Sequence, residues 1–185
     1  MYFDQCRNNY LVNVWFYYGA PDGEGDPSCW IEVDRIRFKT IDNNKMDSDY
    51  PIRRPDSGAN YSFWKHIAIR ADTPPNSFIN NLCIYPGSSM AQTDAHYYVD
   101  QVADYDEATG TQGVTGDVMT NHAQSPTLND LENYDSDTPF EITGSIGNET
   151  GRINDGYILL QVGIGASANI GYSGVENLVI RWDEA

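Results

Sequence analysis

The strongest constraint on the fold is the way short apolar segments alternate with turn-forming residues along the whole chain. No window carries apolar residues at positions i, i+3, i+4 and i+7 over three turns, so the sequence predicts no helix. β-branched and aromatic runs recur instead, bounded by Gly, Pro, Asn and Asp. The segments with this character are Leu11–Tyr18, Cys29–Ile41, Tyr61–Ala71, Ile79–Tyr85, His96–Val102, Phe140–Ile146, Tyr157–Ala166 and Glu176–Glu184.

The alternation within these segments predicts which side chains enter a core. In Cys29–Ile41 the apolar phase reverses near Asp34, which indicates a bulge or a turn at that point. His66 is expected on the sheet surface beside Trp64, opposite the core-facing residues of its segment. The predicted inward-facing side chains are Phe63, Ile67 and Ile69 in the third segment, Ile158, Leu160, Val162 and Ile164 in the seventh, and Leu178, Ile180 and Trp182 in the eighth, where Val179 is expected outside.

About eight antiparallel strands joined by tight turns predict an all-β fold in which two sheets pack as a sandwich. This is the size of a jelly roll, and an immunoglobulin-like sandwich is the nearest alternative that the strand count leaves open. The 185 residues fit a single domain. Two long polar connections, Asp42–Asn60 and Asp104–Thr138, are expected to be loops that contact other subunits in an assembly.

The charge balance restricts the partners of the chain. It has 11 Lys and Arg residues against 27 Asp and Glu residues, which gives a formal net charge of −16 at pH 7. A surface this acidic repels the phosphates of nucleic acids and of anionic membranes, so neither is an expected direct partner. The first residues lack the basic and apolar regions of a signal peptide, and no run reaches the ~18 apolar residues of a membrane helix. The sequence therefore predicts a protein that is made in the cytoplasm and stays there unless it is assembled into a particle.

The sequence lacks the motifs of nucleophilic catalysis and of phosphate binding. Neither G-x-S-x-G nor a glycine-rich phosphate loop is present. His122 lies in a polar stretch without a nearby partner, and Asp94 with His96 offers only two of the ligands that a metal centre needs. We therefore predict no enzymatic activity and no cofactor. The cysteines fit neither a disulfide framework nor a zinc motif, and they are Cys6, Cys29 and Cys83.

Two oxygen-rich stretches are weak candidates for a calcium site. Asp42, Asn44 and Asp47 resemble a calcium loop, because Ca²⁺ takes about six to eight oxygen ligands. The spacing departs from an EF-hand, which has a bidentate Glu at the twelfth position, where this chain has Arg53. A solvated turn rich in Asp and Asn is the favoured alternative. The second stretch, with the same alternative, contains Asn133, Asp135 and Asp137.

A run of aromatic residues begins at Trp15 and ends at Tyr18. A strand divides adjacent side chains between its two faces, so one face of this run is expected in the core. For the other face, packing against a second sheet is favoured over a subunit interface, and an interface over a sugar-binding platform.

From Asp34 to the C-terminus the sequence resembles a recurrent pattern of tailed-phage virion structural proteins, most of them uncharacterised. The resemblance implies a role in the phage particle and carries no catalytic residue to this chain. Residues 1–30 lie outside the pattern, and we interpret them as an additional strand or an assembly arm. The motifs that carry the resemblance are RFKTIDNN (37–44), MD (46–47), PI (51–52), Pro55, SGANYSFWK (57–65), INNLCIY (79–85), the Y..ATGT.G..G loop (105–116) and the closure from YILLQV to RWDE (157–184).

Together these features predict a non-enzymatic virion structural protein, with a capsid decoration or cement protein as the first hypothesis. Its expected partners are the major capsid protein or other virion proteins. A homo-oligomer, with a trimer favoured, would make its attachment multivalent. A tail, neck or baseplate component is the second hypothesis. A carbohydrate-binding or adhesin module, which belongs to a different class of protein, is the third.

Overall fold

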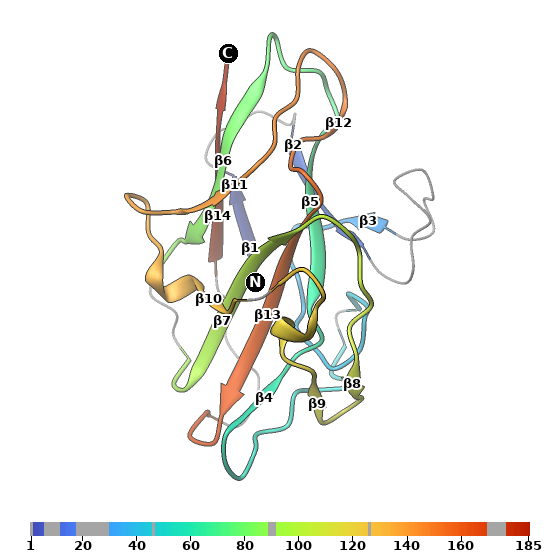
Figure 1. The fold of residues 1–185 in the computed structure, drawn as a ribbon, viewed down its shortest axis with the longest axis vertical. Coiled ribbons are helices and arrows are strands. Elements are labelled where there is room, and N and C mark those ends of the chain that lie inside the picture. Colours follow the sequence, from blue (N-terminus) through green and yellow to red (C-terminus); the bar gives the residue numbers. More distant parts are fainter. Residues whose placement is uncertain are drawn as a thin grey trace.

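The fold is that of a computed structural model, which describes residues 2–5, 12–17, 30–45, 47–88, 92–125, 127–169 and 177–185. Within these residues the chain forms strands and two short 3-10 turns, η1 (Met119–Asn121) and η2 (Leu131–Asn133), and no α-helix (Figure 1). The strands are β1 (Tyr2–Gln5), β2 (Val12–Tyr17), β3 (Trp30–Glu32), β4 (Ala59–Tyr61), β5 (Lys65–Ala71), β6 (Ile79–Pro86), β7 (Ala95–Val102), β8 (Gly110–Thr111), β9 (Thr115–Gly116), β10 (Asn129–Asp130), β11 (Phe140–Ile142), β12 (Gly151–Arg152), β13 (Tyr157–Gly165) and β14 (Asn177–Glu184).

The strands form two sheets that pack against each other as a sandwich (Figure 1). The smaller sheet has the order β1-β14-β6-β11, and the larger sheet has the order β3-β2-β5-β13-β4-β9-β8. Three further pairs extend the larger sheet, namely β7 with β13, β10 with β7, and β12 with β5. The prediction of an all-β antiparallel sandwich is confirmed, with one parallel pair in which β1 lies along β14 and Tyr2 is opposite Asn177.

Six strands from β5 onward, β5, β6, β7, β11, β13 and β14, alternate between the two sheets in chain order. β5, β7 and β13 belong to the larger sheet, whereas β6, β11 and β14 belong to the smaller one. From one of these strands to the next the chain crosses the sandwich, so strands that lie side by side are distant in sequence. Leu159 of β13 is opposite His66 of β5 and also opposite Asp100 of β7, which shows how β13 closes the larger sheet between two earlier strands.

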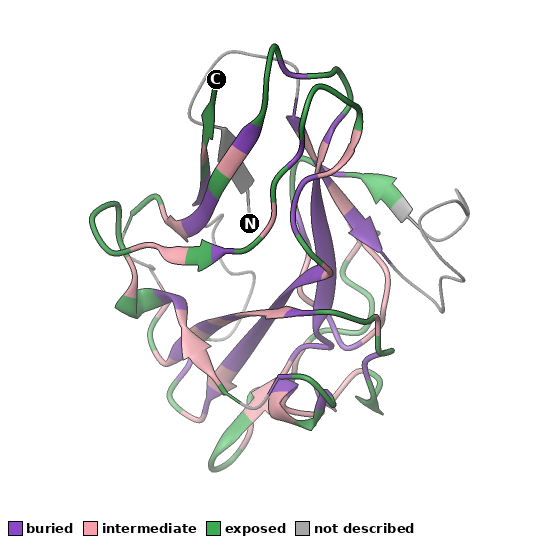
Figure 2. Ribbon diagram, turned by 45° about the horizontal axis from the view of Figure 1, so that its top comes forward, coloured by how far each residue is buried: buried purple, intermediate pink, exposed green. Residues whose placement is uncertain are grey.

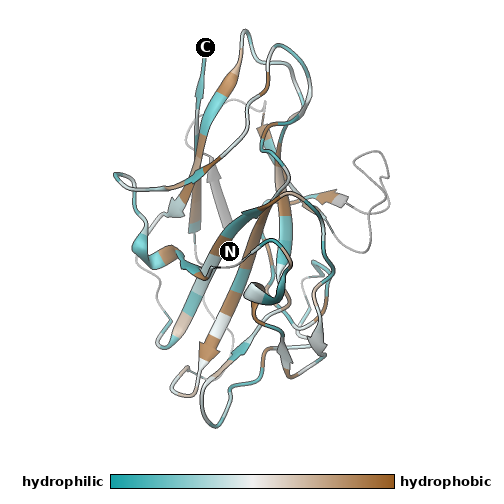
Figure 3. Ribbon diagram, in the orientation of Figure 1, coloured by the Kyte–Doolittle hydropathy of each residue, from teal (hydrophilic) through white to brown (hydrophobic). Residues whose placement is uncertain are grey.

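The main core lies between the two sheets. Ile67 and Ile158 of the larger sheet share one buried cluster with Ile84 and Leu178 of the smaller sheet. β13 is buried along almost its whole length on both faces, which fits its hydrophobic colouring along much of the strand in Figure 3. The long alternating segments of the sequence therefore supply the core, as strand periodicity requires.

The outer face of the larger sheet carries a second buried layer, visible as purple segments away from the sandwich centre in Figure 2. Trp64 and Leu159 pack there with Ala108 and Met119, which come from the connection after β7. The indole N–H of Trp64 donates a 2.7 Å hydrogen bond to the carbonyl of Asp106 in the same connection. This part of the predicted Asp104–Thr138 loop is therefore folded onto the sheet.

Gln161 of β13 joins this second layer to the sheet through its amide. Its side-chain NH₂ group donates to the carbonyls of Ser62 at 2.8 Å and Asp117 at 2.7 Å. Its side-chain oxygen accepts the N–H of Met119 at 2.7 Å. A fully buried amide with three satisfied bonds fixes the connection against the sheet, because an unpaired polar group would be costly there.

The segment 29–41 departs from its predicted strand. Only β3 forms there, and the chain bends at Asp34, where the apolar phase reverses. Farther along, the Lys39 carbonyl accepts the N–H of Phe63 at 2.8 Å, and the Thr40 N–H donates to the Tyr50 carbonyl at 2.9 Å. Both partners, Phe63 and Tyr50, lie outside strands. Ile36 is buried in the main core although its segment forms no strand after β3, so the predicted strand beyond β3 is wrong.

Two side chains face differently from the prediction. Phe63 packs with Trp64 in the outer layer because the chain leaves the ladder between β4 and β5, which breaks the alternation. Val179 is buried: it lies opposite Tyr85 of β6, and its side chain lies next to Gly87. The strand count also exceeds the predicted eight, because short strands give no readable period, and these are β1, β4, β8, β9, β10 and β12.

Candidate functional site

Two of the predicted calcium ligands form ion pairs with buried lysines. Asp42 Oδ1 lies 3.4 Å from Lys65 Nζ, and Asp42 Oδ2 accepts a 2.6 Å hydrogen bond from the Tyr105 hydroxyl. Asp47 Oδ1 lies 2.5 Å from Lys39 Nζ, and this bond holds the pKa of Asp47 below its usual range. Each carboxylate is therefore already next to a positive charge that belongs to the protein.

The side-chain amide of the third predicted ligand, Asn44, is bonded to the backbone of its own connection. Its side-chain oxygen accepts the N–H of Arg37 at 2.9 Å, and its NH₂ group donates to the carbonyl of Arg35 at 2.9 Å. The amide thus closes the connection that follows β3. The described structure gives Asp42, Asn44 and Asp47 three separate sets of partners, and the calcium site remains a prediction that must compete with these contacts.

Lys65 is the central group of this connection. Its side chain is 0% exposed, and its Nζ donates to the carbonyls of Ile41 at 2.6 Å and Asn43 at 3.3 Å. Burial lowers the pKa of Lys65 to about 8, and it outweighs the neighbouring carboxylate of Asp42, which acts in the opposite direction. The Nζ also lies 5.4 Å from the ring centre of Phe16 on β2. The ammonium group therefore takes the place in this loop that an external cation would take.

The second acidic stretch forms a local turn. Asp135 Oδ1 accepts the N–H of Thr138 at 2.8 Å and the N–H of Asp137 at 2.9 Å. These bonds hold the pKa of Asp135 below its usual range. Such a pattern is typical of an Asx turn, which was the favoured alternative for this stretch.

His66 and His122 form a buried pair that the sequence did not predict. Their Nε2 atoms lie 3.3 Å apart, and the two residues are 2% and 3% exposed. The expectations that His66 lies on the surface and that His122 has no partner are therefore wrong. The reason is the second layer, which covers the outer face of β5 and carries His122 onto it.

The hydrogen bonds around the pair assign the tautomer of His122. Its Nδ1 accepts the N–H of Gln124 at 3.2 Å, so in the neutral ring the proton lies on Nε2, the atom that faces His66 Nε2. Burial lowers the pKa of both imidazoles, that of His66 to well below its ordinary value. The Tyr105 ring lies 4.5 Å from the His66 ring, centre to centre. Two neutral rings in an aromatic environment act here as a polar part of the core.

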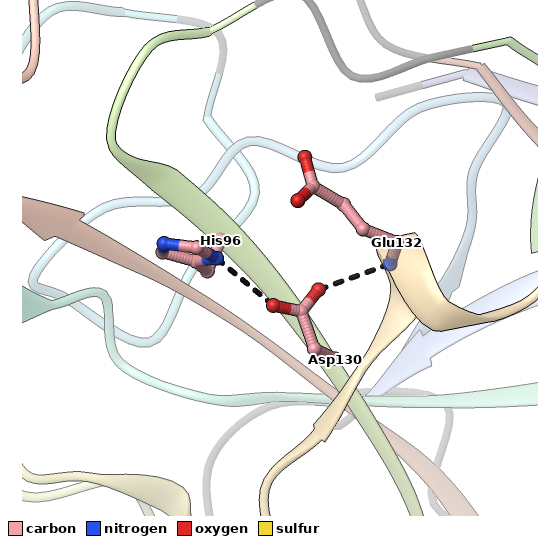
Figure 4. Close-up of side chains that lie close together, drawn as sticks. All are labelled: His96, Asp130 and Glu132. Atoms are coloured by element: carbon pink, nitrogen blue, oxygen red, sulfur yellow. Dashed lines mark hydrogen bonds and ion pairs between the residues drawn. The ribbon is translucent and has the colours of Figure 1, made fainter.

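His96 belongs to a cluster of three side chains with metal-binding atoms (Figure 4). His96 Nδ1 lies 2.9 Å from Asp130 Oδ2, and these atoms and a Glu132 carboxylate oxygen all lie within 4.8 Å of one another. The described residues contain no other such group of His, Cys, Asp and Glu. Asp94, which the sequence paired with His96, accepts instead the N–H of Ser167 at 2.7 Å.

The aromatic run at β2 is largely enclosed. Phe16 lies in the main core and Tyr17 in the second layer. Trp15 is partly buried, and the guanidinium carbon of Arg70 lies 5.9 Å from its ring centre. The favoured prediction for the outward face of this run was packing against a second sheet. Trp15 and Tyr17 pack instead in the second buried layer, to which connections such as the one after β7 contribute, and Tyr18 lies outside the described residues.

A shallow hollow opens on the smaller sheet along β6 and β11. Its lining is mixed, with polar residues such as Asn81, Glu141 and Arg181 beside apolar ones such as Leu82 and Ile142. No aromatic side chain lines it, so it lacks the flat ring on which a sugar face commonly packs. The lining also contains the free thiol of Cys83, and burial raises the pKa of this thiol.

Comparisons with protein-family profiles, with curated protein sequences and with solved structures found no match to this chain. No helix of the described residues is long and apolar enough to cross a membrane. The two packed sheets define the chain as an all-β sandwich protein.

Sequence reasoning missed both histidine arrangements because their partners are far away in the chain. His66 and His122 are separated by 56 positions, and His96 and Asp130 by 34. A local signal existed for part of the second group, since Asp130 precedes Leu-Glu-Asn and Asp is a preferred residue at a helical N-cap. No local pattern indicated that this turn pairs with β7.

Proposed function

We propose that this chain is a non-enzymatic structural protein of a tailed-phage particle and that it decorates the head shell as a cement protein. The observation that carries the proposal is the place of the phage-like motifs in the fold. Residues of RFKTIDNN, of SGANYSFWK and of the Y..ATGT.G..G loop meet in one hydrogen-bonded network. These motifs fix the shape of the connections that they form, as expected for a protein whose role is to present a defined surface to other particle proteins.

Thr40 shows how the motifs depend on one another. Its hydroxyl donates to the Tyr50 carbonyl at 3.0 Å and accepts the N–H of Gly113 at 2.6 Å. The first partner is in the same connection as Thr40, and the second is in the glycine loop near β8 and β9. Because Thr40 is fully buried, these bonds hold two long connections together in a fixed arrangement.

The glycines of the third motif have conformational reasons. Gly113 has a φ of +72°, a left-handed conformation that glycine adopts without strain. Gly116 lies so close to the Ser62 backbone that a Cβ would come within 2.4 Å of its carbonyl oxygen. The first requirement is that of a turn and the second that of close packing between two segments, so both concern the shape of the loop.

The charge distribution favours a location on the outside of a shell. The net charge of −16 disfavours contact with packaged nucleic acid. Lys39 and Lys65 are buried, so two of the 11 cationic residues are withdrawn from the surface. The accessible surface is therefore even more acidic than the composition suggests, and it would fit a partner with exposed basic side chains.

The sandwich also has strand edges that could take part in assembly. The smaller sheet ends at β1 on one side and at β11 on the other. Edge strands present N–H and C=O groups that can pair with another chain. Contacts of this kind, repeated around a threefold axis, would let a homotrimer bind a shell through several modest interactions.

The deciding experiment is the copy number of the chain in purified particles, measured by quantitative mass spectrometry against the major capsid protein. A ratio near one to one supports a decoration protein. A ratio of a few copies per hundred shell subunits contradicts decoration and favours a tail, neck or baseplate component. Absence from the particle refutes the structural role and favours the carbohydrate-binding class, which a glycan array would then test.

A further inference from the structure

We propose that His96, Asp130 and Glu132 form a binding site for a divalent transition-metal ion of the Zn²⁺ type. The inference is independent of the role in a particle, because it depends only on the geometry of these three side chains. His96 lies on β7, Asp130 ends β10, and Glu132 is the middle residue of η2. Figure 4 shows the imidazole and the Asp130 carboxylate facing each other, with the Glu132 carboxylate nearby.

The spacing of the ligand atoms is close to that of a metal centre. Zn²⁺ binds His nitrogen and carboxylate oxygen at about 2.0–2.2 Å, which places tetrahedral ligand atoms about 3.3 Å apart. Here His96 Nδ1 and Asp130 Oδ2 are 2.9 Å apart, and all three ligand atoms lie within 4.8 Å of one another. A small rotation of the Glu132 side chain, which is on an exposed residue, would bring the third ligand into range.

The protein holds two of the three ligands in place. Asp130 Oδ1 accepts the N–H of Glu132 at 3.0 Å and so caps η2, which leaves Oδ2 directed toward His96. Leu131, between the two acidic residues, is completely buried and anchors this turn in the main core. The His96 ring is stacked with Tyr98, with ring centres 6.3 Å apart and planes 22° apart. The ligands are therefore partly preorganised before a metal binds.

The chemistry of the ligand set selects the type of ion. One imidazole nitrogen with two carboxylates suits Zn²⁺ and its neighbours in the first transition row, whereas Ca²⁺ and Mg²⁺ prefer oxygen alone. In the structure the His96 and Asp130 side chains contact each other directly, and a metal would replace that contact. The side chains of His96 and Asp130 are 44% and 22% exposed, so the ion could enter from solvent and keep water in its remaining positions.

Zinc binding by the full chain tests this site. Cys6 and Cys29 are replaced by Ser in every protein, so that their thiols do not compete for the ion. Isothermal titration with ZnCl₂ then compares this parent with His96→Asn and Glu132→Gln. Asn keeps a donor for Asp130, and the Glu132 carboxylate makes no hydrogen bond to another residue in the part of the chain that the structure describes. Glu149→Gln, at an exposed carboxylate outside the cluster, is the matched control.

We expect saturable binding of one Zn²⁺ per chain, weakened at least about tenfold by His96→Asn and by Glu132→Gln and unchanged by Glu149→Gln. CaCl₂ should give no comparable binding. Equal melting temperatures without metal establish that the variants fold. The proposal is overturned if the parent shows no saturable binding, if either cluster variant loses less than tenfold, or if Ca²⁺ binds as tightly as Zn²⁺.

Discussion

Replacement of Lys65 by Met is expected to lower the free energy of unfolding by about 3–5 kcal/mol, which is the usual cost of removing one partner of a buried ion pair. Met fills much of the same space but removes the ammonium group. The carbonyls of Ile41 and Asn43 and the carboxylate of Asp42 then lose their shared donor. The Tyr105 hydroxyl still binds Asp42, so the loss should lie near the lower end of this range.

Urea unfolding at pH 7, followed by tryptophan fluorescence, measures this effect. The expected loss shifts the midpoint by about 1–2 M urea. Lys45→Met is the matched control, because Lys45 is an exposed lysine of the same connection and its replacement should change stability by no more than about 0.5 kcal/mol. Adding Asp42→Asn to Lys65→Met should restore part of the loss, since the unpaired charge is removed. Equal stability of the Lys65→Met and Lys45→Met variants would refute the reasoning.

Three further predictions concern pH and backbone shape. The free energy of unfolding of the wild type, relative to that of Lys65→Met, should rise by about 3 kcal/mol between about pH 8 and 10.5, because the unfolded chain retains the lysine proton that the folded chain releases. Urea midpoints at several pH values measure this difference, and a difference that falls as the pH rises contradicts the prediction. Acidification below pH 6.5 should lower the melting temperature less in His66→Phe than in the wild type, because the unfolded His66 ring then takes up a proton that the buried ring, with its depressed pKa, does not. Gly144→Ala should cost more than about 1 kcal/mol, because φ is +132° and a Cβ would lie 2.3 Å from the Ile153 carbonyl oxygen, whereas Gly147→Ala has open space and should be nearly neutral in the same urea assay.

The strands that could be predicted are those whose side chains alternate over many residues. β6 and β13 lie within one residue of their expected limits, because their burial depends on a regular ladder. The 29–41 segment also contains many apolar residues, but beyond β3 its backbone bonds to loop residues. Hydrophobic content alone does not distinguish a strand from such a connection. Val179 was expected outside because it alternates with the core-facing residues of β14. It is buried although Arg181 and Asp183 of the same face are exposed, so burial differs along one face of this strand.

The candidate sites depended on contacts that cross the sandwich. The oxygen-rich stretch near Asp42 was visible in the sequence, but the lysine that lies against it comes from β5. The sequence paired His96 with Asp94 as two of the ligands that a metal centre needs, whereas in the fold His96 contacts Asp130 and Asp94 accepts the N–H of Ser167. Such errors arise because a β-sandwich places side chains together by register between distant strands, and one sequence does not reveal that register.

The parallel pair of β1 and β14 has a consequence for the order of events in synthesis. Phe3 is opposite Leu178 and Gln5 is opposite Ile180, so the first described strand has no sheet partner until the last one has been made. The smaller sheet can therefore close only after translation has passed β14, and a nascent chain would keep an unpaired edge until then. Shortening the chain before β14 would remove the neighbour of β1 and also a neighbour of β6, which would leave the main core open on one side.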